Sequence, residues 1–172
     1  MGISFVSGRA IGAHRSRAGR GFTLLEVLIV VALIGILVNL AVPAMRKARY
    51  RAMAATVVAD FRMVERATLQ YASDASRYPK DTYPGEVVPE LVPYLKSAIP
   101  WAGRWDKKIA YDFDNWIRPD GTAMYPACNI ATGISIQTKD MDLVAEVNKI
   151  LKPGLVPCVW GTYTYPISAI GQ

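Results

Sequence analysis

The sequence predicts an α+β fold in which one long N-terminal helix packs against a small C-terminal antiparallel sheet. Three observations predict it. The chain has 19 uncharged residues from Val27 to Met45, an apolar stripe with helical spacing between Ala54 and Ala72, and short alternating segments beyond Pro79. Helices and strands that follow one another in this order, without a strand–helix alternation, are typical of an α+β domain.

The composition excludes several classes of protein. With 52% hydrophobic and 20% charged residues among 172, the chain is not wholly disordered and is long enough for one domain with an appendage. Its single histidine, His14, lies in an N-terminal stretch that we expect to be removed. The remaining chain then lacks the histidine of nucleophile triads and of many metal sites, and two cysteines are too few for a four-cysteine site. We therefore expect neither an enzyme nor a cofactor.

The positive charge is concentrated at the N-terminus. Residues 1–21 carry four arginines and no acid, whereas the rest of the chain has 16 basic and 14 acidic residues. Because most of the net charge of +6 lies in this leader, the basic pI does not predict a specific nucleic-acid partner.

The uncharged run from Val27 to Met45 is long enough to cross a membrane. As a helix it spans about 28 Å, close to the hydrocarbon thickness of a bilayer. A buried core helix or a cleaved secretory signal fits less well, since the run is apolar on all sides, exceeds the usual signal length and has no clear small-x-small cleavage site. Basic residues flank it on both sides, so composition alone does not orient it.

Two residues of this segment need a further explanation. Glu26 places a carboxylate in the first turn of an apolar helix, which is expensive in lipid unless the charge is paired. It could also simply complement the helix dipole at the interface. Pro43 lies near the far end of the run, where it predicts a kink.

The run from Gly21 to Leu37, GFTLLEVLIVVALIGIL, resembles the N-terminal motif of type IV pilins and type II secretion pseudopilins. The resemblance covers about 25 residues, and Asn39 is a mild departure from it. It implies cleavage between Gly21 and Phe22 by a prepilin peptidase and methylation of the new N-terminus at Phe22. It also implies that Glu26 pairs with the N-terminus of a neighbouring subunit during assembly, and that Pro43 stands where the family commonly has proline.

The resemblance further implies a pilin-like fold and a location. The leader would be cytoplasmic, the helix would cross the inner membrane once, and the body would face the periplasm or the exterior in a filament. The implied partners are prepilin peptidase, copies of this chain and related pilins or pseudopilins, inner-membrane assembly machinery and membrane lipid.

The helical pattern continues beyond the membrane. Apolar or neutral residues recur at steps of three and four up to Ala72, while Asp60, Arg62 and Glu65 are among the residues left for the exposed face. We expect one helix of about 50 residues, roughly 75 Å long. An anchor followed by a separate amphipathic helix is the alternative. The basic cluster 46–51 could be solvated, pair with acids of an adjacent subunit, or bind lipid phosphates or DNA.

The predicted regions are a leader (1–21), a transmembrane and assembly helix (22–45), its amphipathic continuation (46–78) and a globular body (79–172). In the body, residues 89–96 predict a short helix and residues 141–151 an amphipathic one. Strands are predicted at 108–116, 133–137 and 158–165, the last bounded by Pro157 and Pro166.

Three groups of side chains are candidates for a further role. Cys128 and Cys158 are predicted to form a disulfide, as the family's pilins often have near the C-terminus, although two free buried thiols are the alternative. Asp112, Asp114 and Asp120 are weak calcium candidates, since solvated acids explain them as well. The four tryptophans, Trp101, Trp105, Trp116 and Trp160, could form a ligand surface, with core or rim packing as the default.

The sequence thus predicts a filament subunit polymerised through its N-terminal helix. Pilus, secretion pseudopilus and DNA-uptake filament remain open. A monomeric binding module on a membrane anchor is the alternative.

Overall fold

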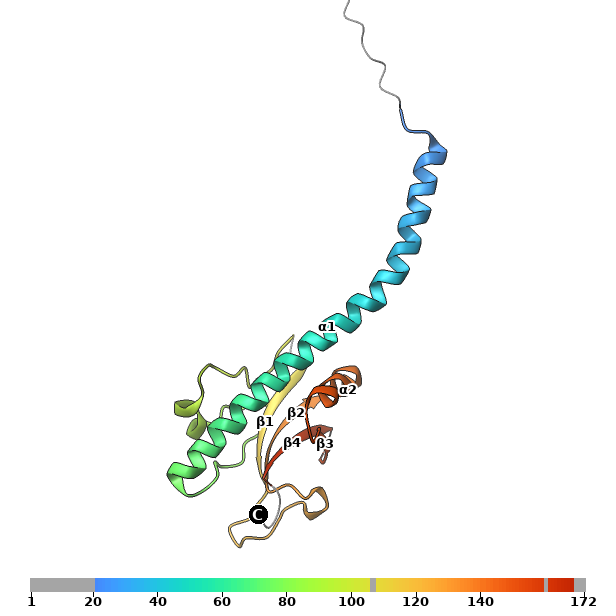
Figure 1. Ribbon diagram of the computed structural model, residues 1–172. Helices are drawn as coiled ribbons and strands as arrows, with labels where there is room; N and C mark the ends of the chain where they lie inside the picture. The colour runs from blue at the N-terminus through green and yellow to red at the C-terminus, as the bar shows by residue number, and fades with distance from the viewer. Residues whose placement is uncertain (1–20, 106–107, 160, 169–172) are drawn as a thin grey trace, which may run out of the picture. The chain divides into compact units, whose positions relative to one another are not determined.

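The computed structural model describes residues 21–105, 108–159 and 161–168. The longest element is helix α1, Leu24–Ala75, which contains Pro43. The chain divides into two compact units between Val42 and Pro43. The first contains the start of α1, and the second contains the rest of α1 and the body (Figure 1).

Within the second unit, α1 buries the face that the apolar spacing predicts. Its buried residues are Met53, Ala54, Val57, Asp60, Phe61, Val64, Ala67, Thr68 and Tyr71. The spacing of three and four keeps them on one side of the helix, and the predicted stripe is confirmed. Asp60 is the exception, because we expected it on the exposed face and its side chain is buried.

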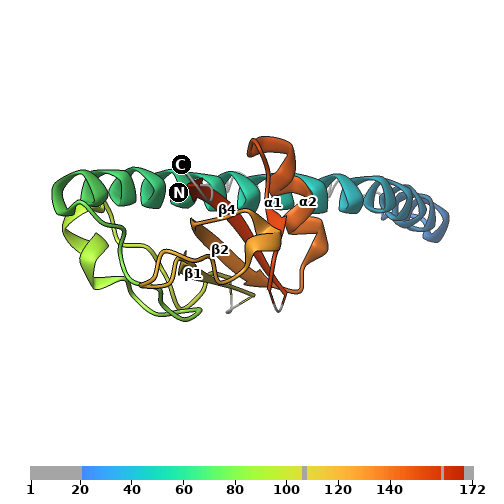
Figure 2. The same ribbon diagram turned by 90° about the horizontal axis from the view of Figure 1, so that it is seen from below.

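A four-stranded antiparallel sheet faces this stripe. Its strands are β1 (Ile109–Asn115), β2 (Thr132–Thr138), β3 (Val156–Pro157) and β4 (Thr162–Ser168), in the order β1-β2-β4-β3. In the register of β1 and β2, Tyr111 pairs with Ile136 and Phe113 with Ile134. These residues and the buried face of α1 belong to one hydrophobic core, and α1 runs along one face of the sheet (Figure 2). The predicted α+β fold is confirmed.

The segment after α1 closes the outer edge of β1. The helix ends at Ala75, before the predicted Pro79, and Ser76 takes a positive φ of 53°. The loop then runs beside β1, where Thr82 N donates to Phe113 O (3.1 Å) and Gly85 N donates to Tyr111 O (2.8 Å). Because its backbone groups are paired in this way, β1 does not present a bare edge.

Both helices that the sequence predicts in the body are present. The segment predicted at 89–96 is a 3-10 helix, Pro89–Tyr94, with Pro93 inside it. Helix α2, Met141–Ile150, buries Leu143, Val144 and Val147 as its spacing predicts. The carboxylate of Asp140 caps α2 by accepting from Leu143 N at 3.2 Å.

The predicted strand 158–165 is wrong in its bounds. The chain instead reverses between β3 and β4, since Thr162 N donates to Val159 O (2.8 Å) and Gly161 takes a φ of 75°. Pro157 lies in β3, on the sheet edge, and Pro166 lies inside β4. Pro166 is tolerated there because it pairs with Gly133 at an irregularity in the β2–β4 register.

Candidate assembly site at the N-terminal helix

Helix α1 begins with a reciprocal cap. Thr23 Oγ1 accepts a hydrogen bond from Glu26 N at 3.2 Å, and Thr23 N donates to Glu26 Oε2 at 3.4 Å. This capping box satisfies two backbone donors that the first turn would otherwise leave free. Glu26 therefore has a local structural partner, in addition to the intersubunit role that the sequence predicts.

Gly21 and Phe22 lie just before the cap and contact little. Phe22 is 80% exposed. A Cβ added at Gly21 would meet no atom within 4 Å, and no left-handed φ demands glycine there. The chain's own packing therefore does not require glycine at this position, so any such requirement comes from a partner.

The first half of α1 exposes an apolar surface on every side. All residues from Leu24 to Met45 are exposed, and the large ones include Leu24 at 86% and Leu40 at 70%. A soluble monomer does not tolerate so large a continuous apolar surface, which must be covered by lipid or by other helices. The helix is long and apolar enough to cross a membrane, and the chain fits a membrane-anchored protein.

In the body, the side chain of Asp60 connects α1 to Arg104 and to Tyr111 of β1 through hydrogen bonds. Its carboxylate accepts a bidentate pair from Arg104, with Nε–Oδ2 at 2.9 Å and Nη2–Oδ1 at 3.0 Å. Tyr111 OH donates to the same Oδ2 at 2.6 Å. Burial, and then the neighbouring carboxylate, raise the pKa of Tyr111, so the phenol stays a donor. The sequence contained no local sign of this pairing, because its members are 44 and 51 positions from Asp60.

The calcium candidates separate into two places. Asp112 and Asp114 are buried on the same face of β1, whereas Asp120 is exposed in a turn and accepts from Thr122 N at 2.8 Å. Among the residues that the structure describes, no group of three or more acidic, histidine or cysteine side chains could hold a metal ion. Asp120 therefore does not complete a three-carboxylate group with the two acids of β1.

The surroundings of the buried acids raise their pKa values. Desolvation, together with the charges of Asp114 and Asp81, raises the pKa of Asp112 to about 7. Desolvation also raises the pKa of Asp114 to about 7, against the hydrogen bond that Ser135 Oγ donates to its Oδ2 at 2.6 Å. Burial likewise raises the pKa of Asp81. Each of these groups is easier to keep neutral than an ordinary aspartate.

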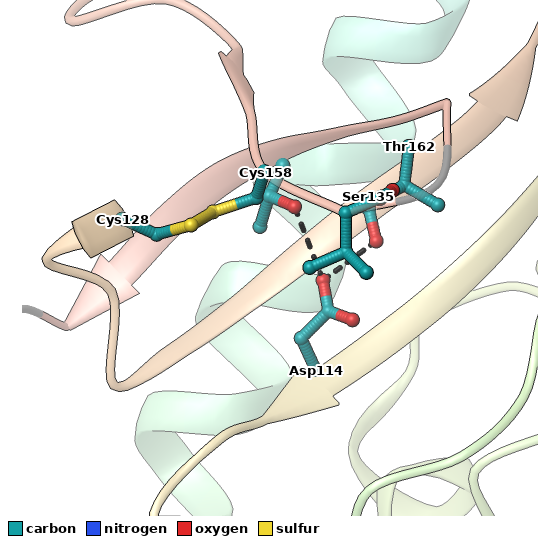
Figure 3. Close-up of a disulfide and its surroundings, with 7 residues drawn as sticks. Asp114, Cys128, Ser135, Cys158 and Thr162 are labelled. Carbon is teal, nitrogen blue, oxygen red and sulfur yellow. Dashed lines mark hydrogen bonds between the residues drawn. A yellow bond between two sulfur atoms is a disulfide. The ribbon is translucent and has the colours of Figure 1, made fainter. Parts of the chain in front are cut away.

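Cys128 and Cys158 form a disulfide, with their Cα atoms 5.8 Å apart. The bond joins the short helix Pro126–Cys128 to the chain just after β3. Figure 3 shows it beside the Asp114 carboxylate and the hydroxyls that bind this carboxylate. The bond thus joins two segments of the body that lie 30 positions apart in the sequence.

Two of the tryptophans pack inside the body. Trp101 is 3% and Trp116 is 5% exposed. Trp105 is partly buried against the core, and Trp160 lies outside the described residues. The three that are described do not form an exposed aromatic surface.

Comparison with known proteins agrees with the N-terminal geometry. The family described as "Prokaryotic N-terminal methylation motif" matches residues 16–38, which include the cap and much of the exposed apolar run. "Type II secretion system core protein G" of Klebsiella michiganensis is 42% identical over 65 residues, which cover 38% of this chain and 46% of the relative. The protein of the same name from Aeromonas hydrophila is 38% identical over 65 residues, with the same shares.

The chain carries a prokaryotic N-terminal methylation motif and is similar, over 38% of its length, to a type II secretion system core protein G. It spans less than half the length of the curated relatives that it matches. No solved structure matches the chain. The exposed glycine, the capped glutamate and most of the uncharged run lie within the matched motif, residues 16–38.

Proposed function

We propose that the protein is a structural subunit of a type II secretion pseudopilus or a related type IV pilus-like filament. It is made as a precursor in the inner membrane with a cytoplasmic N-terminus. Prepilin peptidase cuts it between Gly21 and Phe22 and methylates the amine of Phe22. The mature subunits then polymerise through α1, with the inner-membrane machinery, into a periplasmic or extracellular filament. The observation that carries the proposal is the fully exposed apolar half of α1, with one carboxylate in its first turn.

The charge of Glu26 supplies the register of assembly. Cleavage places an ammonium on Phe22, four residues before Glu26. A carboxylate near lipid is expensive without a partner, and the ammonium of a neighbouring subunit relieves that cost only at one stagger of the two helices. The pairing therefore selects one register among the many that apolar packing alone would allow.

Intact mass spectrometry tests the processing step. The full chain is expressed in cells with and without a prepilin peptidase. We expect loss of residues 1–21 and the gain of one methyl group only where the peptidase is present. A chain that stays uncut in both strains would leave a monomeric binding module on a membrane anchor.

Two variants separate the charge of Glu26 from its capping role. Glu26→Gln removes the charge but keeps a side chain that can serve the capping box, whereas Thr23→Ala removes the cap and keeps the charge. We expect Glu26→Gln to be inserted and folded normally yet to lose most filament incorporation, measured in sheared fractions. Normal incorporation of Glu26→Gln would show that the charge does not set the register.

A further inference from the structure

A basic hollow lies in the body where the chain leaves the uncharged run. It has a volume of about 490 Å³ and lies between α1 and α2. Arg46, Lys47 and Arg49 of α1 line it, together with Lys108 before β1 and Lys149 in the last turn of α2. With five basic and three acidic residues in its lining, its net charge is +2.

Two of the three acids that line the hollow have partners within the subunit. Asp140 caps α2 and also accepts from Tyr50 OH at 3.1 Å. Glu146 pairs with Lys149, and this pairing lowers the pKa of Glu146. Asp142 is the remaining acid of the lining.

Most of the bases have no such partner. In the described parts of the chain, no ion pair involves Arg46, Lys47, Arg49 or Lys108. All four are exposed. The hollow therefore brings together cations of α1 and of the body that have no acidic partner among the described residues. Its charge fits an anionic ligand.

The hollow follows directly after the uncharged run in the chain, and this position indicates which anion it can reach. Arg46 is the first charged residue after the uncharged run that ends at Met45. At 1.5 Å per residue, Arg46 to Arg51 extend about 2 to 9 Å beyond the run, which is the depth of a lipid headgroup layer. Lys108 lies more than 60 positions from the run, yet it lines the same hollow.

We propose that this basic hollow binds the phosphate headgroup of an anionic phospholipid, in the leaflet from which the body emerges. The inference rests on the part of the proposed function that places residues 24–45 in the membrane. Binding would hold the body of an unassembled subunit against the membrane surface until the filament draws it out. Each cation near an anionic membrane surface contributes about a fivefold preference.

The test uses the full chain in phosphatidylcholine vesicles with spin-labelled lipids. We measure the association of labelled phosphatidylglycerol with the protein relative to labelled phosphatidylcholine. We expect a preference for phosphatidylglycerol that weakens with salt and falls about fivefold in Lys108→Gln. The Lys108 side chain makes no hydrogen bond among the described residues, so the substitution leaves the fold intact, and Lys108→Arg keeps the preference.

Lys80→Gln is the matched control. It removes the same charge from an exposed lysine beyond the far end of α1, about 39 Å along the helix from Arg49. It should leave the lipid preference unchanged. Equal preferences in Lys108→Gln and Lys80→Gln would overturn the proposal, because the hollow would then not take part.

Three further outcomes would each overturn the proposal and point elsewhere. In the first, the parent protein shows no lipid preference but broadens the NMR resonance of inorganic phosphate, and Lys108→Gln does not. This result would assign the hollow to free phosphate. Loss of filament assembly in Lys108→Gln, with its lipid preference unchanged, would assign it to a neighbouring subunit. A chain that fails to float with the vesicles would refute the membrane anchor itself, whereas insertion without a preference refutes only the headgroup site.

Discussion

The buried carboxylate of Asp114 makes the body less stable as the pH rises. Its pKa is about 7 in the folded protein, against an ordinary value of 3.8. Between these values the folded protein holds a proton that the unfolded chain has released, so folding takes up a proton and stability falls as the pH rises. A difference of about three pH units, at about 1.4 kcal/mol each, is worth about 4 kcal/mol once the pH exceeds 7.

Asp114→Asn removes this penalty. The amide oxygen can still accept from Ser135 and Thr164, whose hydroxyls bind Asp114 Oδ2 at 2.6 and 3.4 Å. The new amide donors cost about 1 kcal/mol if they find no partner. We therefore expect the variant to be about 2–4 kcal/mol more stable than the parent at pH 8, and no more stable at pH 4.

Thermal unfolding of the full chain in detergent, followed by near-UV circular dichroism between pH 4 and 8, measures this difference. Asp120→Asn is the matched control, because that exposed carboxylate has a pKa lowered by its hydrogen bonds to Thr122. Its variant should show the same pH dependence as the parent between pH 5 and 8. A stability difference between Asp114→Asn and the parent that does not change with pH would refute the protonation account.

Three more substitutions test the packing of the body, each by chemical unfolding of the full chain in detergent. Asp60→Ala leaves the Arg104 guanidinium without its bidentate partner and should cost about 3 kcal/mol, whereas an unchanged midpoint would show that the pair is not stabilising. Gly133→Ala brings a Cβ to 2.5 Å from Thr164 Cγ2 and should cost about 1–3 kcal/mol; a neutral result would mean that the two strands can separate freely. Cys128→Ser opens a disulfide between residues 30 positions apart and should cost about 3–4 kcal/mol, a loss that reduction of the parent should reproduce.

Local patterns in the sequence predict much of the fold. The apolar stripe of α1 and the spacing in α2 each indicate which face of the helix is buried, because helices repeat with a fixed period. The β3–β4 hairpin could not be predicted from such a pattern. An aromatic and β-branched run looks like one strand, and only the turn at Gly161 divides it.

The N-terminal motif can be recognised from the sequence alone, because its parts are adjacent in the chain. Gly21, Phe22 and Glu26 lie within six residues, and Thr23 completes the cap in the same turn. The capping box itself could have been anticipated, since threonine followed three residues later by glutamate before an apolar run is its usual pattern.

The sequence by itself determined the long helix, its uncharged run from Val27 to Met45, the N-terminal methylation motif and the α+β class, since each depends on neighbours within a few turns or strands. Only the tertiary structure decided the burial of Asp60 with Arg104, the raised pKa values of Asp112 and Asp114, and the position of Lys108 beside the basic residues of α1. These features depend on desolvation and on charges brought together from distant positions. The electrostatic free energy of a side chain is set by what surrounds it in space, which periodicity along the chain does not encode.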